Sequence, residues 1–254
     1  MSDDFIETLG IKIMNTCPNT YIYSKTLAES IVAKEMDNIP IIIIRPSIVS
    51  PIWKDPIPGW TDNINGAAGI ITAVGKGVLQ TINSDTGTFC DFVPVDIVVN
   101  ALIWSTYSCL NNNDGRIYNV CGQLPYTWKR VLEISQGLFA NELPFNGVIW
   151  FPRFALSSYS VLHYFRLILL QYIPAACLDI LSIALGRKAR NWKFDNELLK
   201  EDSKLMNRTE MELYSTSVEG IDFKRYVYNG IRAIRLFVFN EKDETISQAR
   251  IHIK

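Results

Sequence analysis

The sequence lacks a glycine-rich phosphate-binding loop. None of its 14 glycines belongs to a GxGxxG pattern, the turn that brings a dinucleotide pyrophosphate to a helix N-terminus. The stretch GIITAVGKG, residues 69–77, has one spacer too many for a Walker loop, and no Ser or Thr follows Lys76. We therefore expect the glycines at 66, 69, 75 and 77 to allow close helix packing or to line a substrate channel.

Histidine and cysteine are too sparse for a metal site. His163 and His252 are the two histidines, and the five cysteines are widely spaced without a CxxC pair. These counts exclude a histidine-rich metal centre and leave little material for a Ser-His-Asp triad. We expect no bound metal, and we expect reduced, buried thiols in an intracellular protein. The net charge of −1 offers no basic face for nucleic acid.

Long uncharged hydrophobic runs are missing too. Within the most apolar block, 148–186, the charge-free stretch LILLQYIPAACL has 12 residues, whereas a membrane-spanning helix needs about 20. The block therefore fits a helix lying in the membrane interface or a buried pair of core helices. The basic residues Arg187, Lys188 and Arg190 suit a cytoplasmic anchor or, equally well, a solvated turn. The acidic opening MSDDFIETLG lacks the apolar run of a signal peptide.

The sequence does contain an alternation of helix-like and strand-like segments. Helices are expected at about 19–36 with Asn19 or Thr20 as cap, at 70–82, at 97–108 after an Asp96 cap, and at 128–139 after a Thr127 cap. Strands are expected at the aliphatic run 41–44, at 88–95 and at 116–122. The unbroken aliphatic run is typical of a strand buried on both faces.

This alternation predicts an α/β fold with a parallel sheet. The strands are too few for a complete doubly wound sheet, so residues 1–147 are interpreted as the C-terminal part of a Rossmann-like doubly wound parallel sheet. Residues 148–254 are rich in helical, aromatic and aliphatic sequence and end in an amphipathic helix near 223–239. They predict a mainly α-helical C-terminal domain.

Tyr21 and Lys25 are four residues apart in the first predicted helix, so they lie on one face, one turn apart. An ammonium beside a phenol stabilises the phenolate, and such a pair can give a proton to a carbonyl oxygen that is being reduced. Tyr23 cannot replace Tyr21, because residue 27 is leucine. The alternative is an ordinary surface Tyr and Lys. The next strand ends in RPSIV, at the carboxyl edge where open α/β sheets bind ligands.

This helix and strand resemble the active-site region of extended short-chain dehydrogenases. Longer stretches resemble one group of these enzymes, the alcohol-forming fatty acyl-CoA reductases in their insect-like form. The stretches are PNTYIYSKTLAE, IPIIIIRPSIVSPIWKDPIPGWTDNINGAAGIITAVGKGVLQT and DFVPVDIVVNALI, with weaker matches at IPAACLDILSIALGRK and FKRYVYNGIRAIRLFVF. The resemblance implies NADPH-dependent reduction of a long-chain acyl-CoA to a fatty alcohol with release of CoA. It also implies an intracellular, membrane-associated protein of the endoplasmic reticulum or the peroxisome.

The same resemblance assigns roles to residues of this chain. It implies that Tyr21 donates the proton and that Lys25 activates Tyr21 and binds the nicotinamide ribose. It places Pro46, Ser47 and Ile48 along the nicotinamide. The segment 53–80 would border the acyl-CoA cleft, and its candidate substrate-binding residues are Trp53, Pro58, Gly59, Trp60, Gly66 and Gly69.

The chain departs from that family in one respect that concerns its activity. Family members carry a GxxGxxG loop, several strands and an orienting Ser that this sequence lacks. We therefore expect a partial copy that by itself neither binds NADPH nor reduces acyl-CoA. Two alternatives stay open: a non-catalytic, membrane-associated partner of an intact reductase, and an extended dehydrogenase or epimerase acting on nucleotide sugars. The aromatic, weakly charged block 148–186 argues against a polar substrate.

Overall fold

The structure is a computed structural model that describes residues 17, 19–84, 87–111, 114–122, 126–152, 155–157, 199 and 205–253. It divides into two compact units. Unit 1 contains Met1–Arg45 and Ile103–Tyr118, and unit 2 contains Pro46–Leu102 and Asn119–Lys254. The predictions for Arg187, Lys188 and Arg190, and for most of block 148–186, lie outside the described residues.

Unit 1 contains helix α2 (Thr20–Ala33). The helix begins where the Asn19 side chain accepts a hydrogen bond from the Ile22 N–H at 2.9 Å, which confirms Asn19 as its cap. Arg45, on strand β1 (Ile43–Pro46), forms a two-point ion pair with Glu29 of the helix. No residue of α2 is buried, and the ion pair between Glu29 and Arg45 links the helix to β1.

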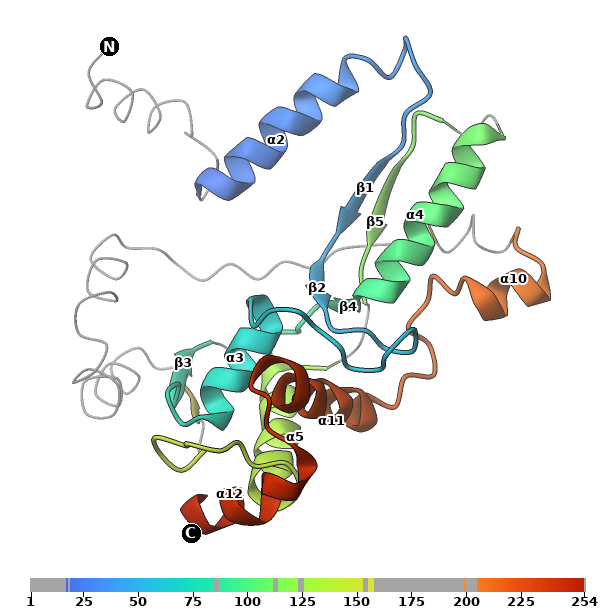
Figure 1. The fold of residues 1–254 in the computed structure, drawn as a ribbon. Helices are drawn as coiled ribbons and strands as arrows, with labels where there is room; N and C mark the ends of the chain where they lie inside the picture. The colour runs from blue at the N-terminus through green and yellow to red at the C-terminus, as the bar shows by residue number, and fades with distance from the viewer. Residues whose placement is uncertain are drawn as a thin grey trace, which may run out of the picture. The chain divides into compact units, whose positions relative to one another are not determined.

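Strand β1 pairs with β5 (Ile117–Val120), as Figure 1 shows. The Ile43 N–H donates to the Arg116 carbonyl and the Ser47 N–H donates to the Val120 carbonyl. Residue numbers increase in the same direction along both strands, so β1 and β5 are parallel. The expectation that the run at 41–44 is buried on both faces is wrong, because these residues are half-buried. Among the described strands β1 has one hydrogen-bonded neighbour, and full burial needs cover on both sides.

Unit 2 holds two further parallel strand pairs and most of the helices. Strand β2 (Ile48–Ser50) pairs with β4 (Phe92–Pro94), and β3 (Thr81–Asn83) pairs with β6 (Ala155–Ser157). The main helices are α3 (Gly66–Gly75), α5 (Trp128–Asn141) and α11 (Phe223–Ala233), which continues into the π-helix η1 (Ile234–Val238). Shorter elements are α10 (Arg208–Leu213), the 3₁₀-helix η2 (Asp243–Thr245) and α12 (Ile246–Ile253). Helix α4 (Val95–Leu110) begins in this unit. Parallel strands alternating with helices confirm the predicted α/β class.

Two predicted elements differ in detail. The helix expected at 70–82 begins at Gly66 and ends at Gly75, because Gly77 takes a positive φ of +74° and the chain then turns into β3. Asp96 lies in the first turn of α4, but it does not cap that helix. Its carboxylate accepts hydrogen bonds from the backbone N–H groups of Trp53 and Lys54. The predicted Thr127 cap of α5 is confirmed by its bond from the Arg130 N–H.

The core of unit 2 forms where α3, α5 and α11 meet. Gly75 allows the closest approach, since a methyl group there would lie 2.6 Å from ring atoms of both Phe139 and Phe145. Among the described residues, sixteen buried ones belong to this core: Ala67, Ala68, Val74, Cys90, Phe92, Val131, Leu132, Leu138, Phe139, Leu143, Phe145, Phe223, Tyr226, Val227, Ile231 and Ile234. The predicted amphipathic helix near 223–239 therefore completes a core that begins some 160 residues earlier.

Two further sequence expectations concern membranes and thiols. None of the helices in the described part of the chain is long and apolar enough to cross a membrane. The described cysteines are free thiols: Cys90 and Cys121 are buried, and Cys17 and Cys109 are half-buried.

Candidate active site

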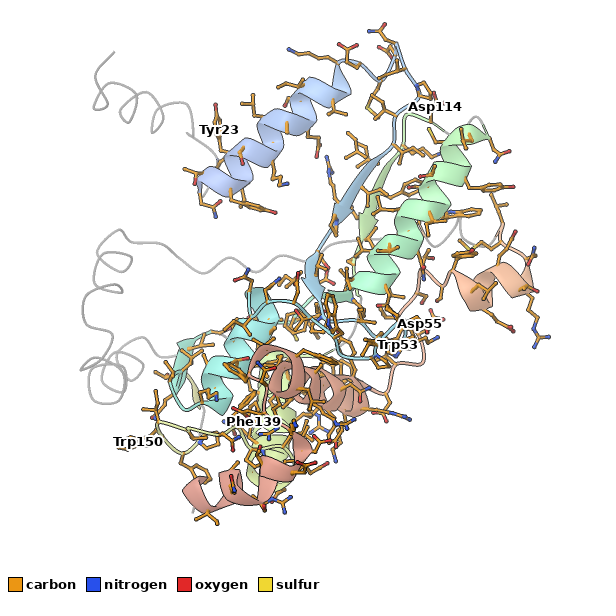
Figure 2. All side chains as sticks on the ribbon, in the orientation of Figure 1. Tyr23, Trp53, Asp55, Asp114, Phe139 and Trp150 are labelled. Carbon is orange, nitrogen blue, oxygen red and sulfur yellow. The ribbon has the colours of Figure 1, made fainter. Side chains whose placement is uncertain are left out.

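The predicted proton-donating pair lies on α2 as the sequence spacing requires. The Lys25 ammonium lies 5.7 Å from the centre of the Tyr21 ring, and the Tyr21 side chain is 68% exposed. Within the described part of the chain, no hydrogen bond engages the Tyr21 hydroxyl or the Lys25 ammonium. Tyr23, labelled in Figure 2 on the same helix, is half-buried. Among the described residues, the contact that involves both groups is the one they make with each other.

The ion pair between Glu29 and Arg45 orients the helix that carries this pair. Hydrogen bonding to Arg45 holds the pKa of the Glu29 carboxyl below its usual value, and Glu29 in turn raises the pKa of Arg45. Because the folded carboxyl is the stronger acid, its contribution is present above the ordinary Glu pKa and is lost as the pH falls below it. Both side chains are partly exposed, so solvent screens the pair.

The other predicted site residues belong to unit 2. At the start of β2, the Ser47 hydroxyl donates to the Asp91 carbonyl at 2.9 Å and lies 3.3 Å from the Asp91 carboxylate. The Gly122 N–H donates to that carboxylate at 2.7 Å. Ser47 thus takes part in a network that joins β2, the segment before β4 and the end of β5. Pro46 and Ile48, which flank it, are exposed.

The loop that follows β2 carries four of the predicted substrate-binding residues. Figure 2 shows Trp53 and Asp55 on it. The Gly59 N–H donates to the Ile52 carbonyl at 2.7 Å, and the Ile52 N–H donates to the Trp60 carbonyl at 3.3 Å. These bonds close residues 51–60, here called the β2 loop, into a compact turn. Pro58 and Trp60 are exposed, Trp53 is half-buried, and the Lys54 ammonium lies 4.2 Å from the Trp53 ring.

Two anchors hold the β2 loop, and neither is part of the predicted site. Asp96 accepts from the Trp53 and Lys54 N–H groups at 3.0 Å each. On α11, the Tyr226 hydroxyl lies 2.8 Å from Ser50 Oγ and 2.7 Å from the Pro51 carbonyl oxygen. Burial raises the pKa of Tyr226 well above its ordinary value, so Tyr226 is a neutral hydrogen-bonding group. The sequence places Tyr226 in an amphipathic helix but gives no signal for its partners, which are 176 and 175 residues away.

Beneath this anchor lies a small apolar cavity of about 30 Å³ between α3, α5 and α11. Ser50, Pro51 and Tyr226 border it on one side, and Ala67, Ala68 and Gly230 are among the small residues of its wall. Its volume suits one or two water molecules. An acyl chain would not fit in it.

The predicted glycines do not form a phosphate site. Gly66 opens α3 with a positive φ of +56°, Gly69 packs its Cα against the Ile64 carbonyl, and Gly75 packs against two phenylalanines. The Lys76 ammonium forms an ion pair with Glu241 at 2.9 Å and donates a hydrogen bond to the Asn146 carbonyl at 2.6 Å. These contacts agree with the expectation of close packing.

Lys76 belongs to a buried ionic cluster that the sequence does not predict. Arg235 has no exposed side-chain surface, and its NH1 lies 3.0 Å from the second Glu241 oxygen. That oxygen also accepts from the Asn146 N–H at 3.0 Å. The Lys76 ammonium lies over the Phe239 ring at 4.3 Å. One carboxylate thus joins the end of α3 to η1 and the segment after it.

Cys90, the most deeply buried thiol of the core, is inert. Its Sγ donates to the Tyr126 carbonyl at 3.0 Å, and burial raises its pKa to about 12. A thiol that stays protonated is a poor nucleophile. Among the described residues, unit 1 therefore offers an exposed phenol and ammonium, and unit 2 separately offers a structured loop.

The sequence is similar to those of known proteins. Residues 1–102 match the family described as "Male sterility protein", an NAD-binding family. Fatty acyl-CoA reductase 2 of Mus musculus is 30% identical over 282 residues, which cover 100% of this chain and 54% of that protein. Fatty acyl-CoA reductase 1 of Homo sapiens is 29% identical, with the same two coverages. "Fatty acyl-CoA reductase wat" of Drosophila melanogaster is 26% identical over 98% of this chain and 53% of its own length.

The chain thus spans about half the length of the curated relatives it matches. Among solved structures, a putative epimerase from Burkholderia cenocepacia J2315 is similar with a TM-score of 0.50 and 14% identity. That match covers 85% of this chain and 54% of the epimerase. At this identity the likeness concerns the fold, and it agrees with the Rossmann-like interpretation.

Proposed function

Because the chain is homologous along its whole length to the fatty acyl-CoA reductases, we propose that it provides the proton-donating and acyl-CoA-binding part of such a reductase. The reaction is the NADPH-dependent reduction of a long-chain acyl-CoA to a fatty alcohol, with release of CoA. The observation that carries the proposal is the Tyr21–Lys25 pair on α2, whose tyrosine is exposed. The relatives of this chain are named fatty acyl-CoA reductases.

The residues present fit one end of a nicotinamide cofactor. The Lys25 ammonium, which lies 5.7 Å from the centre of the Tyr21 ring, can donate to ribose hydroxyls. No segment of the sequence fits the pyrophosphate, since the glycine turn is missing. We propose accordingly that residues 1–254 by themselves do not reduce acyl-CoA.

A bound NADPH would supply one hydride to each of the two reduction steps. In the first step Tyr21 gives its proton to the thioester oxygen as the carbonyl carbon becomes tetrahedral. Expulsion of the CoA sulfur, which leaves as the thiol, then yields an aldehyde. In the second step a proton passes to the aldehyde oxygen and gives the alcohol. Lys25 stabilises the phenolate that Tyr21 becomes in between, and solvent returns the proton.

The test is the substitution Tyr21→Phe, with Tyr23→Phe on the same helix as its control. Loss of the proton donor should lower fatty alcohol formation by about 10²- to 10⁴-fold, while Tyr23→Phe should leave it unchanged. Alcohol formed from palmitoyl-CoA and NADPH is measured by mass spectrometry. If residues 1–254 are inactive alone, they are first joined to the remaining segment of a full-length relative. Unchanged turnover in Tyr21→Phe would remove Tyr21 from the mechanism.

We also propose that the protein acts at an intracellular membrane surface of the endoplasmic reticulum or peroxisome. The proposal rests on the aromatic and aliphatic content of 148–186 and the adjacent Arg187, Lys188 and Arg190. Purified chain should float with anionic liposomes in a density gradient and detach partly at high salt. A chain that stays at the bottom of the gradient at low salt would contradict this.

A further inference from the structure

The β2 loop leaves the sheet at the place where ligands of open α/β folds bind. It follows the carboxyl end of β2, which is parallel to β4. Its side chains Lys54, Pro58 and Trp60 face solvent. Its own backbone bonds close it, but they do not attach it to the rest of unit 2. Its position in that unit must therefore come from other residues.

One attachment comes from a neighbouring helix. The two oxygens of Asp96 accept from two successive N–H groups, those of Trp53 and Lys54, at 3.0 Å each. A carboxylate that accepts backbone bonds in this way is a strong partner. It fixes the first half of the loop, because both donors precede Asp55.

The other attachment comes from α11, near the end of the chain. Tyr226 is 7% exposed, and its single proton can go to one acceptor. The Pro51 carbonyl at 2.7 Å can only accept, so the Ser50 hydroxyl, 2.8 Å away, is placed to donate to Tyr226. One phenol thus ties together the last residue of β2 and the first residue of the loop.

The second half of the loop is pressed against the same helix. Gly59 has a positive φ of +83°, and a methyl group there would lie 2.6 Å from the Gly230 nitrogen and would overlap the Asn229 carbonyl. The loop and the end of β2 therefore meet α11 at Tyr226 and at Asn229–Gly230, which are about one helical turn apart. The helix supports both ends of the loop.

We propose that Tyr226 is a positioning residue for acyl-CoA binding: through Ser50 and Pro51 it sets the geometry of the β2 loop. The inference rests on the proposed function for the identity of the ligand. It assigns to α11, in the region that follows residue 147, a direct part in shaping the substrate side of the fold.

The experiment compares Tyr226→Phe with Tyr228→Phe. Tyr228 is a half-buried neighbour on α11, and its hydroxyl makes no hydrogen bond to the described β2 loop. Trypsin cleavage after Lys54 reports opening of the loop, and tryptophan fluorescence reports binding of palmitoyl-CoA. Tyr226→Phe should speed cleavage and raise the Kd by about two- to tenfold. Tyr228→Phe should change neither, and all three proteins are compared at a temperature well below their thermal midpoints, where each remains folded.

A second comparison tests whether Tyr226 acts through Ser50. Ser50→Ala should speed cleavage after Lys54, and the double substitution with Tyr226→Phe should add little, because coupled partners are not additive. Unchanged cleavage in Tyr226→Phe, or equal acceleration in Tyr228→Phe, would overturn the assignment. If the parent chain binds no palmitoyl-CoA, the ligand assignment of the proposed function fails for this loop. The cleavage rates then still decide the role of Tyr226.

Discussion

At the scale of single residues, Glu241 is the side chain on which most buried charge depends. It is the carboxylate that faces both the Lys76 ammonium and the fully buried Arg235 guanidinium. The Arg235 Nε has no hydrogen-bond partner among the described residues, and the Arg235 NH2 donates to Thr245 Oγ1 at 3.2 Å, so Glu241 is the carboxylate that balances the Arg235 charge. A buried and a half-buried cation without their carboxylate are strongly unfavourable.

Glu241→Gln should therefore lower the free energy of unfolding by about 3–5 kcal/mol. Glu244→Gln, an exposed neighbour on η2, should change it by less than about 0.5 kcal/mol. Urea denaturation followed by circular dichroism measures both values. Equal midpoints for the two variants would show that the cluster is worth no more than a surface pair.

Local residue roles could be predicted from the sequence, and distant ones could not. Asn19 and Thr127 act as caps because a cap bonds to an N–H three residues away, and that distance is visible in the sequence. Asp96 has the same chemistry, yet its donors are 43 and 42 residues away. A sequence pattern cannot show that tertiary contacts outcompete the local cap.

At the scale of elements, glycines in helices differ in how much space surrounds them: some are packed closely and others face open space. Gly75, at the end of α3, faces Phe139 and Phe145 at contact distance, whereas a methyl group added at Gly137 on α5 would have no described neighbour within 4 Å. The C-terminal end of α3 at Gly75 follows from the backbone of Gly77, which has a positive φ that ends the helix. The prediction of a longer helix at 70–82 failed because apolar periodicity continues past that turn.

Gly75→Ala and Gly137→Ala form a matched pair that tests this interpretation. The first should destabilise the protein by about 1–3 kcal/mol, because its methyl overpacks the core. The second should stabilise it by about 0.5–1 kcal/mol, because alanine favours an exposed helix interior. Thermal unfolding monitored by circular dichroism gives both. The same sign of effect for the two variants would contradict the packing of α3 on α5.

At the scale of the whole molecule, the α/β class follows from the alternation of segments, and so does the parallel direction of the strands. The joining of α3, α5 and α11 into one core does not follow. Phe92 and Phe223 lie in that core 131 residues apart, and amphipathicity shows that a helix buries a face without showing against what. The proximity of Tyr21 and Lys25 could be predicted because it is contained within one turn of α2.

The missing glycine turn leads to a prediction about the polypeptide of residues 1–254 taken alone. Backbone N–H groups of such a turn supply most of the pyrophosphate contacts in this fold. Titration calorimetry with NADPH at micromolar concentrations should therefore give no saturable heat. A chimera that adds the remaining segment of a full-length relative should bind. Saturable binding by residues 1–254 would reveal a phosphate site of another kind.

The hydrogen bond between Tyr226 and Ser50 can form only late in the synthesis of the chain. Its two residues are 176 positions apart, so at ribosomal rates of roughly 5–20 residues per second the β2 loop waits roughly 9–35 s for its partner helix. Throughout that interval the apolar faces of β4 and α3 have no α11 to cover them. These faces therefore stay exposed or in non-native contacts until the ribosome has passed Ala233, the last residue of α11.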